Sequence, residues 1–290
     1  VIIPTWNRVD KLGEAIMSAL NQTYGNLEVL VCDDGSTDNS EEFVKSIKDE
    51  RVKWLPGSHS GLPSIPRNRG IRNAKGYWLA FLDSDDLWQP EKLELQLNSL
   101  HLNKTFAIVT NAIRQDKQGG GGGLLLNLES VSKLSFAELI IDNKVITSSC
   151  LIKKDLIKII GYFPESKKLK AYEDYAYWLR LSSFIYFDII NKPLVFYFDS
   201  PTTSIRSLAG NHLITKIYVM IDFFVWSFKK NRINLIPSFF IWFTTPIFNN
   251  FKKIYWKVME YLFSYKEKIY REVLQPNDGP KISVVMPVYN

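Results

Sequence analysis

The sequence predicts an α/β protein in which helices cover both faces of a Rossmann-like, doubly wound, mostly parallel sheet, followed by a C-terminal helical extension. Over the first part of the chain, short apolar segments alternate with segments whose apolar residues recur at helical spacing. Strands that alternate with helices require right-handed crossovers, and such crossovers build an open parallel sheet. With 46% hydrophobic and 23% charged residues, the 290-residue chain has enough apolar material for a buried core.

The strands and helices of this first part are expected in strict alternation. Strands are predicted at Val1–Pro4, Leu27–Cys32, Arg51–Leu55, Tyr77–Leu82 and Phe106–Asn111. Helices are predicted between them at Lys11–Leu20, Ser40–Lys48, Pro66–Ala74 and Pro90–Leu102. The second strand is apolar almost throughout, which is typical of a strand covered on both faces. The side chains of residues 36–38 are expected to cap the helix that begins at Ser40, and Gly76 to end the third helix.

The pattern becomes less regular after this alternation. Five consecutive glycines at 119–123 indicate a flexible surface loop. Beyond them, helices are predicted near Ser135–Asp142 and at Glu173–Ser182, and strands near Ser149–Ile152 and at Leu194–Tyr197.

We divide the chain into three parts. Residues 1–207 are assigned to the α/β domain, residues 208–275 to the helical extension, and residues 276–290 to a linker and the start of a second domain of the same kind. The last part is inferred from a repeat, because the terminal KISVVMPVYN resembles the initial VIIPTWN in its apolar strand, its proline and its aromatic–Asn pair.

Cysteine use and charge narrow the class of protein. Cys32 and Cys150 both lie in apolar runs, which indicates buried thiols in a reducing compartment and therefore a cytoplasmic location. The first residues read as a strand end and predict no signal peptide. The net charge of +6 is mild, and we expect no nucleic-acid partner.

Two carboxylates follow the second predicted strand. Asp33 and Asp34 stand directly before Gly35 and Ser36, and carboxylates at a strand end suit a pocket that accepts hydrogen bonds from a nucleobase or a ribose. The same residues also fit an acidic turn whose Ser36 or Thr37 caps the next helix. The residues alone leave both interpretations open.

Three carboxylates in four residues follow the fourth predicted strand, in the segment Asp83-Ser84-Asp85-Asp86. Clustered carboxylates repel one another in a partly dry site, and a divalent cation such as Mg²⁺ or Mn²⁺ relieves that repulsion. In an extended segment, Asp83 and Asp85 point to one side and the other two residues to the opposite side. The pair can therefore face one nucleotide and its metal. The alternative is a solvated acidic turn before the next helix.

Arg67, Glu173 and Asp174 are the other candidates for the site. Arg67 stands near a helix N-terminus, where a guanidinium suits a diphosphate and fits equally well in a salt bridge with the aspartates. Glu173 and Asp174 open a predicted helix. A carboxylate there is either a partner of the helix dipole or a general base that deprotonates an acceptor hydroxyl.

Five motifs occur in one order: PTWNR, CDDGSTDNS, PRNRGI, YWLAFLDSDDLWQPEKL and YEDYAYWLRL. Over residues 1–205, their order and spacing resemble the family 2 glycosyltransferases with the GT-A fold. The resemblance implies an inverting enzyme that uses a nucleotide-diphospho-sugar with Mn²⁺ or Mg²⁺, and UDP-linked donors are the default. It also implies a saccharide or lipid-linked acceptor in surface polysaccharide or glycan synthesis.

The resemblance implies roles for single residues where the motifs match. The residues implied to bind the nucleotide-sugar are Pro4, Trp6, Asp34, Arg67, Asp83 and Ser84. Among them, Pro4 and Trp6 would line the base pocket, and Asp34 would accept from the pyrimidine N3–H. Asp83 would contact the ribose, and Asp85, together with Asp83, would bind the metal.

The catalytic residues implied by the resemblance are Asp174, as the base, and Glu173 beside it. Asp174 would remove a proton from an acceptor hydroxyl that attacks the anomeric carbon directly, and Arg67 would assist the leaving diphosphate. Neither His59 nor His212 is assigned as a metal ligand.

Two other functions share parts of this pattern. A nucleotidyltransferase of the sugar-nucleotide pyrophosphorylase type has a similar sheet and metal carboxylates, but it requires a Gly-rich phosphate loop that the N-terminal PTWNRVDKLG lacks. A non-catalytic GT-A scaffold domain is the second alternative. The carboxylates present in every motif argue against it.

The segment 211–274 is helical in pattern, aromatic and basic. Aromatic faces edged by lysines are typical of helices that lie on an anionic membrane leaflet, here the inner face of the plasma membrane. The alternative is that these faces pack against the α/β domain or a second domain. Neither apolar stretch reaches the ~20 residues that a membrane-spanning helix needs.

Overall fold

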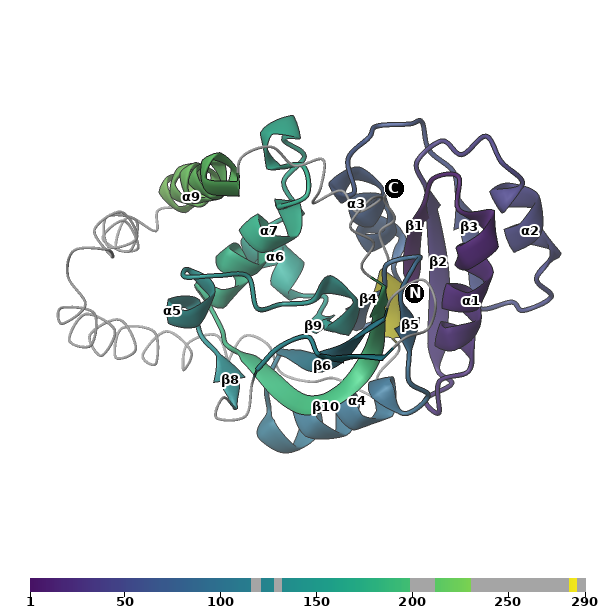
Figure 1. The fold of residues 1–290 in the computed structure, drawn as a ribbon, viewed down its shortest axis with the longest axis horizontal. Helices are drawn as coiled ribbons and strands as arrows, with labels where there is room; N and C mark the ends of the chain where they lie inside the picture. Colours follow the sequence, from purple (N-terminus) through teal and green to yellow (C-terminus); the bar gives the residue numbers. More distant parts are fainter. Residues whose placement is uncertain (116–120, 128–131, 199–211, 231–281, 286–290) are drawn as a thin grey trace.

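The computed structural model describes residues 1–115, 121–127, 132–198, 212–230 and 282–285, and one mixed sheet runs through it (Figure 1). The sheet has 11 strands, in the order β1-β2-β11-β4-β9-β6-β10-β5, with β3 beside β2, β7 beside β6 and β8 beside β10. The predicted α/β class is confirmed. The helices and strands of the first and second halves form two adjoining parts that share this sheet.

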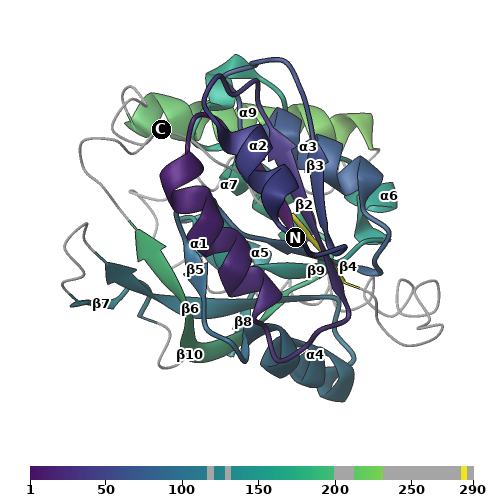
Figure 2. The same ribbon diagram turned by 90° about the vertical axis from the view of Figure 1, so that its right-hand side faces the viewer.

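The first half of the sheet is parallel. Its strands are β1 (Ile2–Thr5), β2 (Leu27–Asp33), β3 (Val52–Leu55), β4 (Trp78–Phe81) and β11 (Ile282–Val285). The helices that connect them are α1 (Val9–Leu20), α2 (Ser40–Ser46) and α3 (Ser64–Asn73). Helices α1 and α2 lie on one face of these strands and α3 lies on the other, as Figures 1 and 2 show. This is the doubly wound arrangement that the sequence predicts.

Strand β11 lies in line with β1, between β2 and β4. Leu30 of β2 is opposite both Ile2 of β1 and Val285 of β11. The segment 281–290, which resembles the start of the chain, thus contributes a strand to this sheet. That residues 276–290 begin a second domain stays a prediction.

The second half of the sheet is mixed. Its strands are β5 (Leu87–Trp88), β6 (Ala107–Gln115), β7 (Gly121–Leu124), β8 (Lys133–Leu134), β9 (Leu151–Lys153) and β10 (Phe187–Phe198). Strand β9 is antiparallel to both β4 and β6, and β10 runs parallel to β6 with register shifts on either side of Pro193. The remaining helices are α4 (Lys92–Asn103), α5 (Phe136–Leu139), α6 (Leu156–Ile160), α7 (Glu173–Ser182) and α9 (His212–Lys229), with 3₁₀ turns η1 (Thr147–Ser149) and η2 (Lys167–Leu169).

The core forms two clusters, one on each face of the sheet. In β2, Leu30 and Cys32 belong to one cluster while Val29 and Val31 belong to the other. Alternate side chains of a strand point to opposite faces, so a strand that is apolar throughout must be covered twice. Helix α7 carries much of one cluster, and its Trp178 packs edge-on against Phe81 of β4. This packing fixes the N-terminus of α7 against the sheet.

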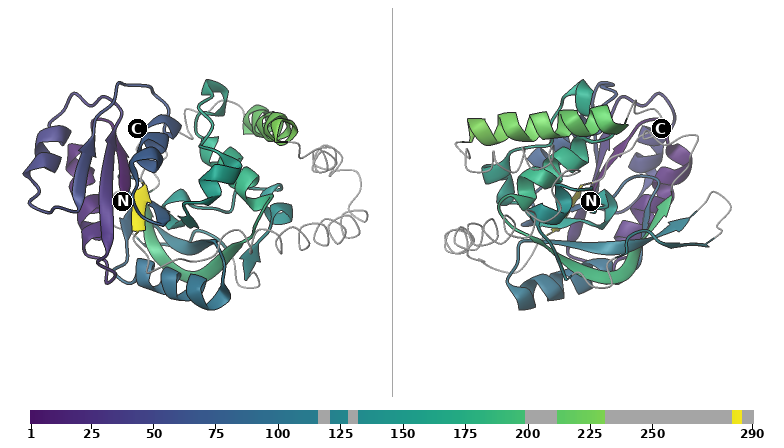
Figure 3. Two further views of the ribbon diagram at one scale, coloured as in Figure 1. Left: turned by 180° about the vertical axis from the view of Figure 1, so that it is seen from behind. Right: turned by 60° about the vertical axis from the view of Figure 1, so that its left-hand side comes forward.

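Helix α9 lies across the outer side of α7 (Figure 3). The guanidinium of Arg180 in α7 forms an ion pair with Asp222 in α9 at 2.6 Å and also faces the ring of Trp226. Of the predicted extension 208–275, the structure describes α9. The part from 231 to 274 lies outside the described residues. No helix in the described ranges has both the length and the apolar character to cross a membrane.

The predicted elements of the first half are confirmed, with small shifts of their ends, and α7 has the predicted bounds. Two local predictions, the Gly76 cap and the loop over the whole glycine run, are wrong, and the capping of α2 is partly borne out. Gly76 does not cap α3, because that helix ends at Asn73 with Ala74 in an extended conformation. The N-cap position of α2 is Asn39, which makes no side-chain capping bond, but the Asp38 carboxylate accepts from the backbone N–H of Ser40 at 3.1 Å, so the expected capping by residues 36–38 is borne out for Asp38. Part of the glycine run, Gly121–Leu124, forms β7, because β6 extends past its predicted end and offers an edge for pairing.

Two further details complete the comparison. The predicted strand Leu194–Tyr197 is the end of the longer β10. Cys32 and Cys150 are both buried free thiols, as expected.

Gly35 shapes the turn after β2 and generates the first prediction. Its φ of +81° is unfavourable for other residues, and an added Cβ would lie 2.5 Å from the backbone nitrogen of His59. We expect Gly35→Ala to lower the free energy of unfolding by about 1–3 kcal/mol, as measured by urea denaturation.

Gly25→Ala is the matched control, because an added Cβ there meets nothing within 4 Å. Equal stability of the two variants would show that the close approach of the Gly35 turn to His59 is relaxed in solution.

Candidate active site

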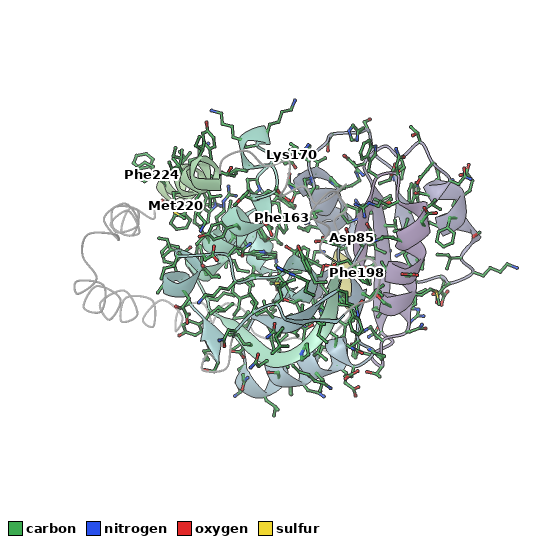
Figure 4. The ribbon with its side chains drawn as sticks, in the orientation of Figure 1. Asp85, Phe163, Lys170, Phe198, Met220 and Phe224 are labelled. Carbon is green, nitrogen blue, oxygen red and sulfur yellow. The ribbon has the colours of Figure 1, made fainter. Side chains whose placement is uncertain are left out.

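The acidic loop, residues 83–86, follows β4 and turns its side chains alternately outward and inward. The side chains of Asp83 and Asp85 are 25% and 23% exposed, whereas Ser84 and Asp86 are buried. This is the alternation that an extended segment predicts. Figure 4 places Asp85 near the middle of the molecule, where the two halves of the sheet adjoin.

The Asp83 carboxylate lies near two other carboxylates and one guanidinium. The pKa of its carboxyl is raised to about 7, chiefly by burial and also by the neighbouring carboxylates of Asp85 and Asp174, while Arg67 opposes the rise. The guanidinium of Arg67 lies 3.3 Å from Oδ1 of Asp83. Arg67 therefore holds Asp83 toward α7, because the same guanidinium also pairs with Glu173.

Asp85 has a different arginine. Nη1 of Arg8 donates to Oδ2 of Asp85 at 3.2 Å. Burial raises the pKa of the Asp85 carboxyl, and the charges of Arg8 and Lys11 oppose that rise. Arg8 stands at the N-terminus of α1, so the first helix and the acidic loop meet at this contact.

Asp86 is turned into the protein. Its carboxylate accepts from the hydroxyl of Ser148 and, at 3.0 Å, from the backbone N–H of Phe198 at the end of β10. Burial raises the pKa of Asp86 well above its usual value. Asp86 therefore fixes the loop to β10 and η1, and the two outward carboxylates remain for a ligand.

Arg67 and Glu173 form a buried ion pair between α3 and α7. Nη1 of Arg67 donates to Oε1 of Glu173 at 2.7 Å, and both side chains are about 5% exposed. Burial raises the pKa of Glu173, and Arg67 opposes the rise. Of the two alternatives for Arg67, the salt bridge is thus present in the described structure. A role in assisting the donor stays a prediction.

Asp174 is the second residue of α7 and lies beside the acidic loop, since its charge acts on Asp83. The hydroxyl of Thr147 donates to its Oδ2 at 3.1 Å, and the amide of Asn143 lies 3.5 Å from the same oxygen. Ala171, three residues earlier, has a φ of +69°, a strained value for a residue with a side chain. The structure thus brings the predicted base close to the predicted metal ligands.

The residues predicted for the nucleobase gather at the ends of β1 and β2. The ring of Trp6 stacks on His59 with centroids 4.4 Å apart, and Pro4 is buried opposite Cys32 in the sheet. The carboxylate of Asp34, only 1% exposed, accepts from the N–H groups of residues 60 and 61 and from the Ser60 hydroxyl. In the described structure Asp34 fixes this neighbouring loop. Its contact with a base stays a prediction.

Ser84 lies beside the predicted metal ligands but points inward. It is fully buried, and within the described ranges its Oγ has no hydrogen-bond partner. Its role with the donor stays a prediction.

Sequence analysis missed several residues that hold the site. Asn7 accepts from the N–H groups of Thr37 and Asp38, which ties the turn after β1 to the turn after β2. Its φ of +51° is a conformation that asparagine tolerates better than most residues. Thr147 and Ser148 contact Asp174 and the acidic loop. Their partners are distant in sequence, so no local pattern identifies them.

The pair of outward carboxylates fits a divalent cation. Mg²⁺ and Mn²⁺ are held by one or two carboxylates together with substrate phosphates, so a complete protein cage is not required. Correspondingly, no group of three or more His, Cys, Asp or Glu side chains in the described ranges forms such a cage. The carboxylates of Asp85 and Asp174 add to the rise in the pKa of Asp83, and a cation would offset that repulsion.

The fold and site together define a glycosyltransferase of the GT-A type. Two solved structures share the fold. Staphylococcus aureus TarS (1–349) in complex with UDP-GlcNAc has a TM-score of 0.59 at 19% identity, covering 81% of this chain and 73% of that one. The mannosyltransferase PcManGT from Pyrobaculum calidifontis, in complex with GDP-Man and Mn²⁺, has a TM-score of 0.52 at 14% identity, with 93% and 82% covered.

The chain belongs to glycosyl transferase family 2, whose family model matches residues 1–153. An uncharacterized glycosyltransferase of Haemophilus influenzae is 30% identical over 87% of this chain and 96% of its own length. Escherichia coli WfaP, named a UDP-Glc:α-D-GlcNAc-diphosphoundecaprenol β-1,3-glucosyltransferase, is 31% identical over 63% of this chain and 69% of its length. The resemblance inferred from the five motifs is confirmed.

Some relatives are much longer than this chain. An uncharacterized glycosyltransferase of Rickettsia bellii is 35% identical over 63% of this chain, but the match spans 26% of that protein. Family membership sets aside the pyrophosphorylase-type alternative, because the relatives are named glycosyltransferases. A non-catalytic GT-A scaffold domain would belong to the same family, so transfer activity decides that alternative.

Removing one partner of the Arg67–Glu173 pair gives the second prediction. Arg67→Met leaves the Glu173 carboxylate buried without its counter-charge, and we expect a loss of about 3–5 kcal/mol in the free energy of unfolding. Urea denaturation without any ligand measures it. The double variant Arg67→Met/Glu173→Gln removes both charges, and we expect it to recover part of the loss. A double variant no more stable than Arg67→Met would contradict this explanation.

Proposed function

We propose that this protein transfers a sugar, with inversion, from a nucleotide-diphospho-sugar to a hydroxyl of a saccharide or lipid-linked acceptor. One observation carries the proposal: the Arg67–Glu173 pair brings Asp174 close to Asp83, the first of the two outward carboxylates, at the carboxyl ends of the strands. In open α/β sheets, ligands bind at those ends. A UDP-linked donor is favoured, and the UDP-GlcNAc complex of TarS and the printed activity of WfaP support that choice.

The donor side of the site is assigned to the first half of the chain. Pro4, Trp6 and Asp34 are proposed to hold the base, with Ser84 beside them. Asp83 and Asp85 would hold Mn²⁺ or Mg²⁺, which supplies positive charge to the diphosphate when bound. The Mn²⁺ complex of PcManGT supports this assignment.

Asp174 is proposed as the general base. It accepts the proton of the acceptor hydroxyl, whose oxygen forms a bond to the anomeric carbon as the bond from that carbon to the diphosphate breaks. The electron pair of the broken bond stays on the departing diphosphate, so no covalent enzyme intermediate is needed. Glu173 holds Arg67 beside Asp83, where the guanidinium adds positive charge to the donor side.

The acceptor side is proposed to lie on an anionic membrane surface, which is the inner face of the plasma membrane for a cytoplasmic enzyme of surface polysaccharide synthesis. One face of α9 packs on α7, and the opposite face exposes four apolar residues at helical spacing: Ile214 (50%), Ile221 (44%), Val225 (45%) and Phe228 (58%). Lys229 and Lys230 follow, both exposed. Apolar residues edged by lysines bind anionic interfaces.

Transfer activity tests the proposed chemistry. Wild-type protein is incubated with UDP-glucose, UDP-galactose or UDP-GlcNAc, Mn²⁺ and a synthetic GlcNAc-diphospho-lipid, and the released UDP is measured. We expect Asp174→Asn to lower kcat by about 10²-fold or more, with donor affinity near that of wild type, because a general base contributes 10²–10⁴-fold.

Asp85→Ala should instead lose the Mn²⁺-dependent binding of UDP, measured by calorimetry. Asp155→Asn, which removes a carboxylate that pairs with Lys158 on α6, is the control and should keep both properties. A kcat of Asp174→Asn equal to that of wild type would exclude Asp174 as the base.

The membrane proposal has its own test, flotation with vesicles that contain phosphatidylglycerol. The double variant Ile221→Glu/Phe228→Glu adds two charges to the exposed face of α9, and we expect it to lose salt-sensitive flotation. Leu102→Glu is the matched control, because Leu102 is 79% exposed on α4, far from α9 in Figures 1 and 2. Flotation that is unchanged in the double variant would show that α9 makes no membrane contact.

A further inference from the structure

The 3₁₀ turn η1 stands between the two groups that the reaction must align. Its three residues, Thr147, Ser148 and Ser149, are buried, although all three carry hydroxyl groups. Buried hydroxyls are costly unless each has a hydrogen-bond partner. The hydrogen-bond partners of these three residues therefore show which parts of the site η1 holds in place.

Ser148 holds the acidic loop. Its Oγ accepts from the backbone N–H of Asp83 at 3.0 Å and donates to the carboxylate of Asp86. Its carbonyl accepts from Nε1 of Trp88 at 2.7 Å. One residue thus contacts the loop at its start, at its end and beyond it, so the position of Asp83 is set relative to η1.

Thr147, the residue before Ser148, contacts the proposed base, Asp174. Its Oγ1 donates to Oδ2 of Asp174 at 3.1 Å. Neighbouring residues of one short turn therefore contact the base and the metal-binding loop. Turn η1 is thus one rigid connection between those two groups, in addition to the one that Arg67 makes between Glu173 and Asp83.

Turn η1 is itself anchored to the core by hydrogen bonds from α4. Nε2 of Gln96 donates to the carbonyl of Ser149 at 2.8 Å, and Gln96 accepts from the buried ammonium of Lys92 at the same distance. Both residues lie on α4, which belongs to the second core cluster through Leu93 and Leu97. Movement of η1 would disrupt these buried contacts, so the turn is a fixed reference point.

We propose that Thr147 is a positioning residue for catalysis, whose hydroxyl orients the Asp174 carboxylate toward the acceptor hydroxyl at a fixed distance from the acidic loop. The inference rests on the proposed function, in which Asp174 is the base. Misplacing a catalytic group by a fraction of the reaction distance lowers the rate without weakening substrate binding. A threonine is suited to this task, because its branched side chain has few rotamers and points the hydroxyl in one direction.

The test compares Thr147→Val, which keeps the shape of the side chain and removes the hydroxyl, with Thr147→Ser, which keeps the hydroxyl. The assay is UDP release with the most active of the three UDP-sugars and the synthetic GlcNAc-diphospho-lipid. We expect Thr147→Val to lower kcat by about tenfold with the donor KM within about twofold of wild type. Thr147→Ser should restore kcat to within about threefold of wild type.

Thr110→Val is the matched control. Thr110 is fully buried in β6, and its hydroxyl donates to the carbonyl of the adjacent residue, away from Asp174 and the acidic loop. The change in kcat of Thr110→Val measures the general effect of removing a buried threonine hydroxyl. We expect kcat of this variant to stay within about twofold of wild type.

A second comparison separates positioning from a structural role. If Thr147 acts through Asp174, Thr147→Val added to Asp174→Asn should lower kcat no further, because effects within one unit are not additive. A further tenfold loss in the double variant, or a kcat for Thr147→Val within about twofold of wild type, would overturn the inference.

The two proposals fail in different ways. If Asp174→Asn keeps normal turnover, the base assignment itself is wrong. If Asp174→Asn loses turnover and Thr147→Val does not, the base assignment stands and the role of Thr147 is wrong.

Discussion

The buried ion pair between Arg67 and Glu173 is the constraint on which the rest of the site depends. Two charges removed from water are tolerated only when their geometry is held closely. Here the aromatic packing of α7, including the stack of Tyr177 on Phe163 with centroids 3.9 Å apart, holds Glu173 in place. Because the same guanidinium also reaches Asp83, the position of α7 and the position of the acidic loop are set together.

Charge imbalance follows from this arrangement. Carboxyl groups gather where β4 ends and α7 begins, and burial raises the pKa of Asp83, Asp85, Asp86 and Glu173 alike. Arg8 and Arg67 each neutralise part of that charge. The cation proposed for this site would offset the repulsion between these carboxyl groups.

Local patterns predicted the elements of the first half, because hydrophobic periodicity and strand-end acids are properties of short segments. They also predicted which carboxylates of the acidic loop face outward. They did not predict that Asp34 would be used by the loop at residues 60–61, or that Asn7 and Thr147 would hold the site. Those contacts join residues that tertiary packing alone brings together. The mixed pairing of β9 and β10 was missed for the same reason.

The Arg67–Glu173 pair also bears on how the protein folds during synthesis. Its partners are 106 positions apart, and the segment that matches the family model ends at residue 153, before α7. A ribosome adds about 5–20 residues per second, so Arg67 waits roughly 5–20 s for its partner to be made. Until then its guanidinium lacks the carboxylate that it is buried with. A nascent chain that ends before α7 already carries the segment that matches the family model, but it lacks Glu173 and Asp174 and therefore the ion pair that joins α3 to α7.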